Sequence, residues 1–324
     1  MQDPSPTERT ERTERSELLL PTIELRRAAA LRRFGDATRQ LERAAARGEL
    51  SRVRRGHYVD AAEWQYLSYE QRHLMKVVAA APAARTPPVF SHESAAVALG
   101  LSVVEPLPSR VQITVPPGSG LRSNRRVARH EAALDADEVI DLGPLLVTSV
   151  RRTLVDFAAT RSFLSGACAV EHALHRGDVD HDELCDAIAT RKPFRGSRRA
   201  DAVAAFASPL SASPNETLCR VRFAELGVPQ PQQQVRFRGL NGIEYPVDFY
   251  WPQFDAIGET DGRVKYEQPE YLAGRTPQEA LWDEKQREDE LRAQCRRFVR
   301  LTWNDAWNRA PLAVKLARAG IRHH

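Results

Sequence analysis

The sequence predicts a mixed α/β (α+β) fold built in several parts. Segments with helical periodicity alternate with short alternating runs that are typical of strands. Near the start, helices precede a small basic hairpin, and the last part has the order helix, three strands, helix, strand. A chain of 324 residues is long enough for two or three domains of ordinary size.

Composition narrows the class of protein. With 42% hydrophobic and 28% charged residues, the chain is expected to be globular. The cysteines, Cys168, Cys185, Cys219 and Cys295, lie far apart without a CxxC pair, so neither a zinc site nor a disulfide framework is indicated. The start, MQDPSPTERTERTERSE, lacks the apolar run of a signal peptide, and no stretch approaches the roughly 20 apolar residues of a membrane span. We therefore expect a cytoplasmic protein without a membrane partner.

Arginine dominates the basic residues of a chain whose net charge is +4 and whose pI is about 9.0. The guanidinium group binds phosphate through a planar fork, so clustered arginines indicate a polyanionic partner. The clusters are RVRR at 52–55, RSNRRVAR at 122–129 and RKPFRGSRR at 191–199. A GC-rich coding bias, with the arginines on solvated faces, explains this composition equally well. The positions of the clusters along the chain must decide between the two explanations.

The first part is interpreted as a short tail followed by a DNA-binding module. Residues 1–17 repeat TER without periodicity and are expected to be disordered. Residues 18–62 predict a winged helix-turn-helix: a helical segment from Leu18, a second helix between Asp36 and Gly48, and a hairpin in ELSRVRRGHYVD. In such a module the second helix enters the major groove of DNA and the hairpin lies on the phosphates.

The predicted DNA face consists of arginines. Residues four apart share one side of a helix, and this spacing joins Arg39, Arg43 and Arg47, while Leu41 faces inward. The hairpin adds Arg52, Arg54 and Arg55. The alternative is a small helical domain with a solvated arginine face.

The middle part, residues 63–190, predicts a mixture of helices and strands. A helix is expected to begin near Ser91, RVQITVP to form a strand, and PLLVTSVRRTLVDFA to run from a strand into a helix on which Arg152 and Asp156 pair. Residues 191–208 are interpreted as a basic linker leading into a helix, with a domain boundary near Ser208.

Three motifs in order, LSRVRRGHYVD, FSHESAAVALGL and VTSVRRTLVDFA, resemble the AbiEi-type antitoxin family of type IV toxin-antitoxin systems. The resemblance spans roughly residues 18–165. VRRGHY and SAAxxxGL carry it most specifically. It implies an N-terminal winged helix that binds DNA, often the antitoxin's own promoter, and a cognate toxin as a candidate partner.

The last part, residues 209–324, predicts an ordered α-β-β-β-α-β domain. SPNETLCRVRFAELG has the capping pattern of a helix, with Ser213 as cap and Gly227 as stop. QQQVRFR and IEYPVDFYW are predicted strands around an Asn-Gly turn, and AIGETDG is a third. A capped helix begins at Thr276, RRFVRLTW is the last strand, and a terminal helix is expected from about Leu312.

Acidic residues stand where a buried strand ordinarily carries none. Glu259 and Asp261 are two residues apart and so share one face of the sheet, and the neighbouring strand can present Asp248 opposite them. Three carboxylates that close together are compatible with burial when a cation neutralises them, and hard oxygen ligands favour Mg²⁺ or Mn²⁺. On the following helix, Glu284 and Glu288 lie on the inward side, either as rim salt bridges or as the outer wall of this site.

This arrangement resembles the PD-(D/E)XK nuclease superfamily. VDFYWP, GETDGRVKY, EKQREDELR and VRLTW are similar to a domain family related to very-short-patch repair endonucleases, over roughly residues 210–310. The resemblance implies a restriction-endonuclease-like fold, with Asp248 and Glu259 as metal ligands and Glu216 as a further one.

One position departs from the superfamily pattern. Asp261 occupies the place of the lysine that ordinarily orients the attacking water, and Lys265 or Lys285 is the expected replacement. Two of the acids also have structural explanations. Glu216 fits a capping box, and Asp261 with Gly262 fits a turn.

Two functions are therefore expected from the sequence. In the first, the N-terminal part binds DNA and the C-terminal part hydrolyses phosphodiester bonds with Mg²⁺ or Mn²⁺. In the second, the chain is an antitoxin-like repressor that uses the nuclease fold only to bind DNA or a partner.

Overall fold

The computed structural model describes residues 24–28, 37–81, 87–240, 242–261 and 276–322. The chain divides into two compact units, residues 1–207 and 208–324, which are described separately. The boundary agrees with the one expected near Ser208. The tail 1–17, the cap Asp36, Lys265 and most of the first expected helix lie outside the described residues.

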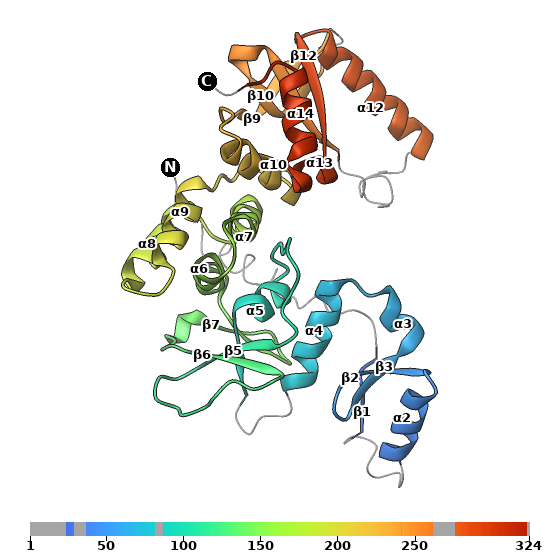
Figure 1. Ribbon diagram of the computed structural model, residues 1–324, viewed down its shortest axis with the longest axis vertical. Coiled ribbons are helices and arrows are strands. Elements are labelled where there is room, and N and C mark those ends of the chain that lie inside the picture. The colour runs from blue at the N-terminus through green and yellow to red at the C-terminus, as the bar shows by residue number, and fades with distance from the viewer. Residues whose placement is uncertain (1–23, 29–36, 82–86, 241, 262–275, 323–324) are drawn as a thin grey trace. The chain divides into compact units, whose positions relative to one another are not determined.

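A small sheet with one helix opens the first unit (Figure 1). Its strands are β1 (Arg26–Arg27), β2 (Leu50–Arg54) and β3 (His57–Asp60), in the order β1-β3-β2. Helix α2 (Ala37–Ala46) packs on it through Leu41, which contacts a core with Leu50 and Tyr58. Gly48, with φ of +80°, follows the end of α2 as expected.

The first expected helix begins at Leu18, and only residues 24–28 of its first part are described. These residues contain the strand β1 and no helix. Arg26 pairs with Tyr58 and Arg27 with His57 in antiparallel register. Residues 24–28 read as helix by local propensity, but the free edge of β3 offers them ladder hydrogen bonds, and tertiary pairing overrides a weak local preference. The prediction of helix was wrong for this segment.

A five-stranded mixed sheet forms the centre of the first unit. The elements are α3 (Ala61–Tyr66), α4 (Tyr69–Ala80), β4 (Val89–Phe90), α5 (His92–Ala98), β5 (Val111–Val115), β6 (Val127–Glu131), β7 (Val139–Asp141) and β8 (Leu146–Thr148). The strand order is β6-β5-β4-β8-β7. The strand expected at RVQITVP is β5. Its five residues are all buried.

Four helices complete the core of this unit: α6 (Val150–Thr160), α7 (Phe163–Arg176), α8 (His181–Arg191) and α9 (Ser197–Phe206). Ser149 caps α6, and Arg152 pairs with Asp156 at 2.8 Å as expected. Residues 197–206, expected within the basic linker, form α9, whose Ala200 and Val203 are buried in the shared core. The helix at Ser91 begins as predicted, but the Ser91 hydroxyl bonds the His92 ring instead of capping it.

The second unit has the predicted order of elements and one more helix. The elements are α10 (Pro214–Glu225), β9 (Gln232–Arg238), β10 (Glu244–Trp251), β11 (Ala256–Asp261), α12 (Pro277–Arg292), β12 (Arg297–Thr302), α13 (Trp303–Asn308) and α14 (Ala310–Arg318). Strands β9, β10 and β11 are antiparallel, and β12 adds in parallel to β11, giving the order β12-β11-β10-β9.

Different residues of β10 and β11 pack against the helices on the two faces of this sheet. On one face, Phe223 of α10 meets Phe249 and Trp251 edge-on at 5.3 and 5.1 Å. A side chain at Gly258 would stand 2.9 Å from Trp251, so the residue beneath this aromatic cluster has to be glycine. Ile257 packs instead in a cluster with Leu291 of α12. Asp248 and Glu259 belong to the strands between these layers.

Candidate active site and nucleic-acid interface

The end of the β10–β11 ladder places Asp248 and Glu259 near each other. The two strands pair through Trp251–Ala256, Tyr250–Ile257 and Phe249–Gly258, and the pairing ends there. Asp248 and Glu259 are the next residues of the two strands, and the charge of Asp248 is one of the causes that raise the pKa of Glu259. Their bonding partners differ: Arg287 of α12 bonds Glu259, whereas Asp248 is bonded by Thr260, whose side chain leaves β11 on the other face from Glu259. The two acids are therefore neighbours, although the ladder does not pair them.

Glu259 is a buried carboxyl group with one arginine partner. Its side chain is 5% exposed, and Arg287 of α12 donates from Nη2 to both carboxylate oxygens at 3.0 and 3.1 Å. Burial, followed by the negative charge of Asp248, raises the pKa of Glu259 to about 7, although Arg287 acts in the opposite direction. At neutral pH this group is poised between its two protonation states, a property that is concentrated at functional sites.

Asp248 is held by the strand it faces. Its Oδ2 atom accepts hydrogen bonds from the backbone N–H and the hydroxyl of Thr260, both at 2.7 Å. The Thr260 N–H therefore bonds a side chain of β10, in place of the backbone carbonyl that a continued ladder would offer it. Asp248, Glu216 and Asp305 also raise the pKa of the Cys219 thiol, after the larger effect of burial. These three acids thus lie close enough to Cys219 for their charges to act on it. The sequence analysis did not single out Thr260. The one sequence feature that could have indicated it is its hydroxyl group between Glu259 and Asp261.

Glu216 is close to this acidic region but satisfies its own helix. It accepts from the Ser213 hydroxyl at 2.7 Å and from the Ala212 N–H at 3.0 Å, and Gln234 of β9 donates to it at 3.3 Å. The Ser213 hydroxyl in turn accepts from the Glu216 N–H, so the capping interpretation fits these contacts. Glu216 is only 4% exposed and contributes charge to the site from the start of α10.

Glu284 and Glu288 form salt bridges at the rim. Arg300 of β12 contacts Glu284 at 2.8 Å and Glu288 at 2.7 Å, and Arg292 contacts Glu288 at 2.6 Å. This outcome corresponds to the first of the two interpretations of these glutamates. Because Arg300 pairs with Glu259 in the β11–β12 register, the network borders the acidic pair.

The other expected site residues are not gathered at the pair. Asp261 ends β11 opposite Thr302, two residues beyond Glu259, where β10 and β11 no longer pair. Lys285 is exposed, with Nζ 6.0 Å from the Trp282 ring. In the part of the chain that the structure describes, no three His, Cys, Asp or Glu side chains are grouped closely enough to hold a metal ion, so Asp248, Glu259 and Asp261 do not form the three-carboxylate cluster that period-two spacing predicted. The β10–β11 ladder ends at Phe249–Gly258, before any of the three acids, and Thr260 occupies the Asp248 carboxylate.

Oxygen donors suitable for a divalent cation are nevertheless present in the pair itself. Asp248 and Glu259 supply carboxylate oxygens, and the chemistry of this set fits Mg²⁺ or Mn²⁺ better than a softer metal. A cation would replace the Arg287 guanidinium as the counter-charge of Glu259. It would also favour the ionised form of a carboxyl group whose pKa is raised.

The predicted DNA face lies at the surface of the small N-terminal sheet and α2. Arg39, Arg43, Arg47, Arg52 and Arg55 are exposed and Arg54 is half-buried. Burial and the charge of Arg126, in the basic cluster 122–129, lower the pKa of Arg54. Arg47 is bonded at 2.6 and 3.0 Å to Glu49, so its guanidinium already has a carboxylate partner. Strand β1 adds two exposed arginines, Arg26 and Arg27, that sequence reasoning had assigned to a helix.

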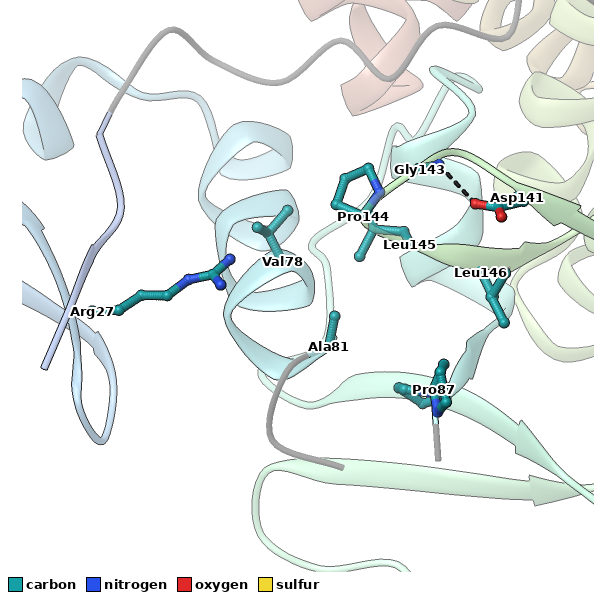
Figure 2. A pocket seen from close by; sticks show the side chains of 10 residues that line it. Arg27, Val78, Ala81, Pro87, Asp141, Gly143, Pro144, Leu145 and Leu146 are labelled. Atoms are coloured by element: carbon teal, nitrogen blue, oxygen red, sulfur yellow. Dashed lines mark hydrogen bonds between the residues drawn. The ribbon is translucent and has the colours of Figure 1, made fainter. Parts of the chain in front are cut away.

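A cavity of about 480 Å³ lies elsewhere in the first unit (Figure 2). Val78 of α4 and Leu145 line it, with Arg27 on one side and the Asp141–Gly143 turn on the other. The Asp141 carboxylate is occupied by the Gly143 N–H at 2.8 Å. Among the described residues that line the cavity, most are apolar and the polar groups of Arg27 and Asp141 lie on opposite sides, so they do not converge as in a catalytic site.

Comparisons with known proteins add no assignment. No family model matches the chain. No curated protein matches it either. Within the described residues, none of the helices has the length and apolar character needed to cross a bilayer. The structure thus defines a mixed α/β protein with a buried Glu259 near a half-buried Asp248 in one unit and an arginine surface in the other.

Proposed function

We propose that the chain is a DNA-binding protein whose C-terminal unit hydrolyses phosphodiester bonds with a divalent cation, Mg²⁺ or Mn²⁺. The observation that carries the proposal is the Asp248–Glu259 pair. A fold gains nothing in stability from two neighbouring acids between strands, one of them 5% exposed with a pKa of about 7. A bound cation would polarise the phosphoryl oxygen and lower the pKa of its water.

The chain's own residues would have separate tasks in this reaction. Asp248 and Glu259 would hold the cation, and Thr260 would keep the Asp248 carboxylate in position through its two hydrogen bonds. The resemblance to PD-(D/E)XK nucleases adds Glu216 and Asp261 as further acids and Lys265 as the candidate to orient water. The arginines of α2 and the β2–β3 hairpin, in a winged-helix arrangement, would bring the DNA to the protein.

The test is cleavage of plasmid and single-stranded DNA by the purified full chain with Mg²⁺ or Mn²⁺. Asp248→Asn and Glu259→Gln keep the shape of each side chain but weaken cation binding, and we expect both to abolish cleavage. Glu284→Gln is the matched control, because that acid pairs with Arg287 and Arg300 at the rim. Equal background from the wild type and all three variants would refute hydrolysis.

A non-catalytic DNA-binding regulator is the second candidate function. It is favoured by the contact of Arg287 with both oxygens of Glu259, since this acid already has a counter-charge. In that case the chain would act as an antitoxin-like repressor, with a cognate toxin as the partner that the resemblance suggests. Binding to DNA upstream of its own coding region, without cleavage under any metal, would distinguish this function.

A further inference from the structure

Two tryptophans of α13 form an exposed aromatic pair. The rings of Trp303 and Trp307 are stacked, with centroids 5.7 Å apart and planes inclined by 17°. Each residue is 38% exposed, although they are among the largest apolar side chains of the chain. They are four residues apart, so they lie on one side of α13. Another flat ring can stack on two exposed aromatic rings that are already stacked on each other.

The pair stands at the edge of the sheet where the acidic residues are found. In the parallel β11–β12 ladder, Glu259 pairs with Arg300 and Asp261 pairs with Thr302. Trp303 is the residue after Thr302. The aromatic pair therefore begins one residue beyond the strand end that carries Asp261, and only a few residues along the same ladder from Glu259.

Several contacts fix the position of α13. Thr302 caps the helix with Asp305, and Lys315 of α14 bonds Asp305 at 2.6 Å. Arg222 of α10 donates to the Ala306 carbonyl at 3.0 Å. A rigid helix presents its side chains without the entropic cost of ordering a loop on binding. The tryptophans are thus preorganised.

The charge beside α13 suits a phosphate backbone. Arg222 and Arg309 both bond the same oxygen of Glu225, at 2.7 and 2.6 Å. Two guanidinium groups sharing one carboxylate leave one positive charge in excess. Nucleobases linked by phosphates combine flat aromatic faces with negative charge, and proteins that bind single strands use aromatic side chains together with cations.

We propose that Trp303 and Trp307 form a stacking platform for an unpaired base of single-stranded DNA. The class of ligand rests on the proposed function, but the platform itself does not require cleavage. In duplex DNA the faces of the bases are covered by their neighbours, so the platform selects single strands or unpaired positions. It would hold the strand at the end of β12, where α13 begins.

The experiment measures binding without hydrolysis. Wild-type chain in EDTA is titrated into a fluorescein-labelled thymidine oligonucleotide and into an abasic oligonucleotide with the same number of phosphates. Loss of one stacked base weakens binding by roughly tenfold or more. We expect Trp303→Ala and Trp307→Ala to bind the thymidine strand about tenfold more weakly, and the wild type to bind the abasic strand as weakly as the variants do.

Controls separate stacking from folding. Trp282→Ala removes an exposed tryptophan of α12, 59% exposed, and should leave affinity unchanged. Trp303→Phe and Trp307→Phe keep an aromatic face and should retain most of the binding, while melting curves report any loss of fold. Equal affinity of the wild type for the two strands, or unchanged affinity in both alanine variants, would overturn the proposal.

The two proposals fail separately. Metal-dependent cleavage that survives in the tryptophan variants, with unchanged binding, would refute the platform and leave hydrolysis. A base-dependent, tryptophan-dependent affinity in a protein that never cleaves DNA would refute hydrolysis and leave the platform.

Discussion

Glu259 shows at the scale of one residue how burial alters the chemistry of a carboxyl group. Its pKa is raised from 4.5 to about 7, first by burial and then by Asp248. A raised pKa means that the folded chain binds the proton more tightly than the unfolded chain. The resulting contribution to stability is fully present below about pH 4.5 and is lost as the pH rises to about 7.

Glu259→Gln removes this titration. We expect the variant and the wild type to be about equally stable near pH 5. Near pH 8 we expect the variant to be more stable, on the order of 3 kcal/mol, because the wild type then has an ionised buried carboxylate. Urea unfolding of both proteins between pH 5 and pH 8 measures the difference, with Glu284→Gln as control. Parallel curves for Glu259→Gln and the wild type would show that the pKa is not raised.

Arg152 is the corresponding buried cation of the first unit. Its side chain is 1% exposed and bonds Glu138 at 2.9 Å and Asp156 at 2.8 Å. Arg152→Ala leaves Asp156 without its paired cation in a buried place, while Glu138 keeps Arg191 at 3.2 Å, and we expect a loss of about 3 kcal/mol in the free energy of unfolding. Arg151→Ala is the matched control. Arg151 pairs with Asp137 at the surface, 41% exposed, and its loss is expected to cost less than about 1 kcal/mol.

Chemical denaturation of the full chain, followed by circular dichroism, checks this prediction. If Arg152→Ala and Arg151→Ala lowered the free energy of unfolding equally, burial would not be what makes the Arg152 ion pairs important for stability.

At the scale of elements, the entry to α9 depends on one close approach. Gly196, with φ of +87°, precedes α9, and a Cβ atom there would stand 2.2 Å from the Ala159 carbonyl oxygen at the end of α6. Non-bonded atoms do not approach this closely, so any residue with a side chain at position 196 would force α9 away from α6. Residues 197–206 therefore belong to the packed core of the unit, and their basic character reflects the exposed face of α9 alone.

Gly196→Ala is expected to destabilise the first unit by about 3 kcal/mol, from the left-handed backbone and the steric overlap together. Gly118→Ala isolates the first effect, because Gly118 has φ of +72° with nothing within 4 Å of its Cβ position. We expect a loss of about 1 kcal/mol there. Thermal unfolding of the two variants measures both values, and equal losses would mean that α9 moves freely.

At the scale of the whole molecule, the chain consists of two units with separate cores. The second unit contains its own four-stranded sheet with aromatic packing between α10 and β10. A fragment of residues 208–324 is therefore expected to fold alone. A cooperative thermal transition with near-ultraviolet circular dichroism would confirm independent folding. A fragment without fixed tertiary signals would show that the second unit needs the first.

DNA binding is also a property of the whole molecule, because it depends on the summed charge of a surface. Replacing Arg43 and Arg54 with alanine is expected to weaken DNA binding and to lower the slope of log affinity against log salt concentration by about 2, since each phosphate contact contributes about one. Arg198→Ala combined with Arg318→Ala removes the same charge from other exposed helices. Equal slopes for the two double variants would place the DNA surface elsewhere.

Local sequence determined much of the secondary structure and part of the site. Capping patterns marked α10 at Ser213 and α12 at Thr276, because a cap bonds N–H groups only two or three residues away. Period-two spacing predicted Glu259 and Asp261 on one face of their strand, because alternation along a strand is a local property.

Tertiary structure decided which partners each group obtained. The bonds from Arg287 to Glu259 and from Thr260 to Asp248 join residues 28 and 12 positions apart, and the β10–β11 ladder ends before it reaches Asp261. Residues 26–27 became a strand because β3 offered a free edge. Hydrogen bonds, burial and the pKa of a carboxyl group depend on atoms that folding brings together across the chain, so no local pattern contains them.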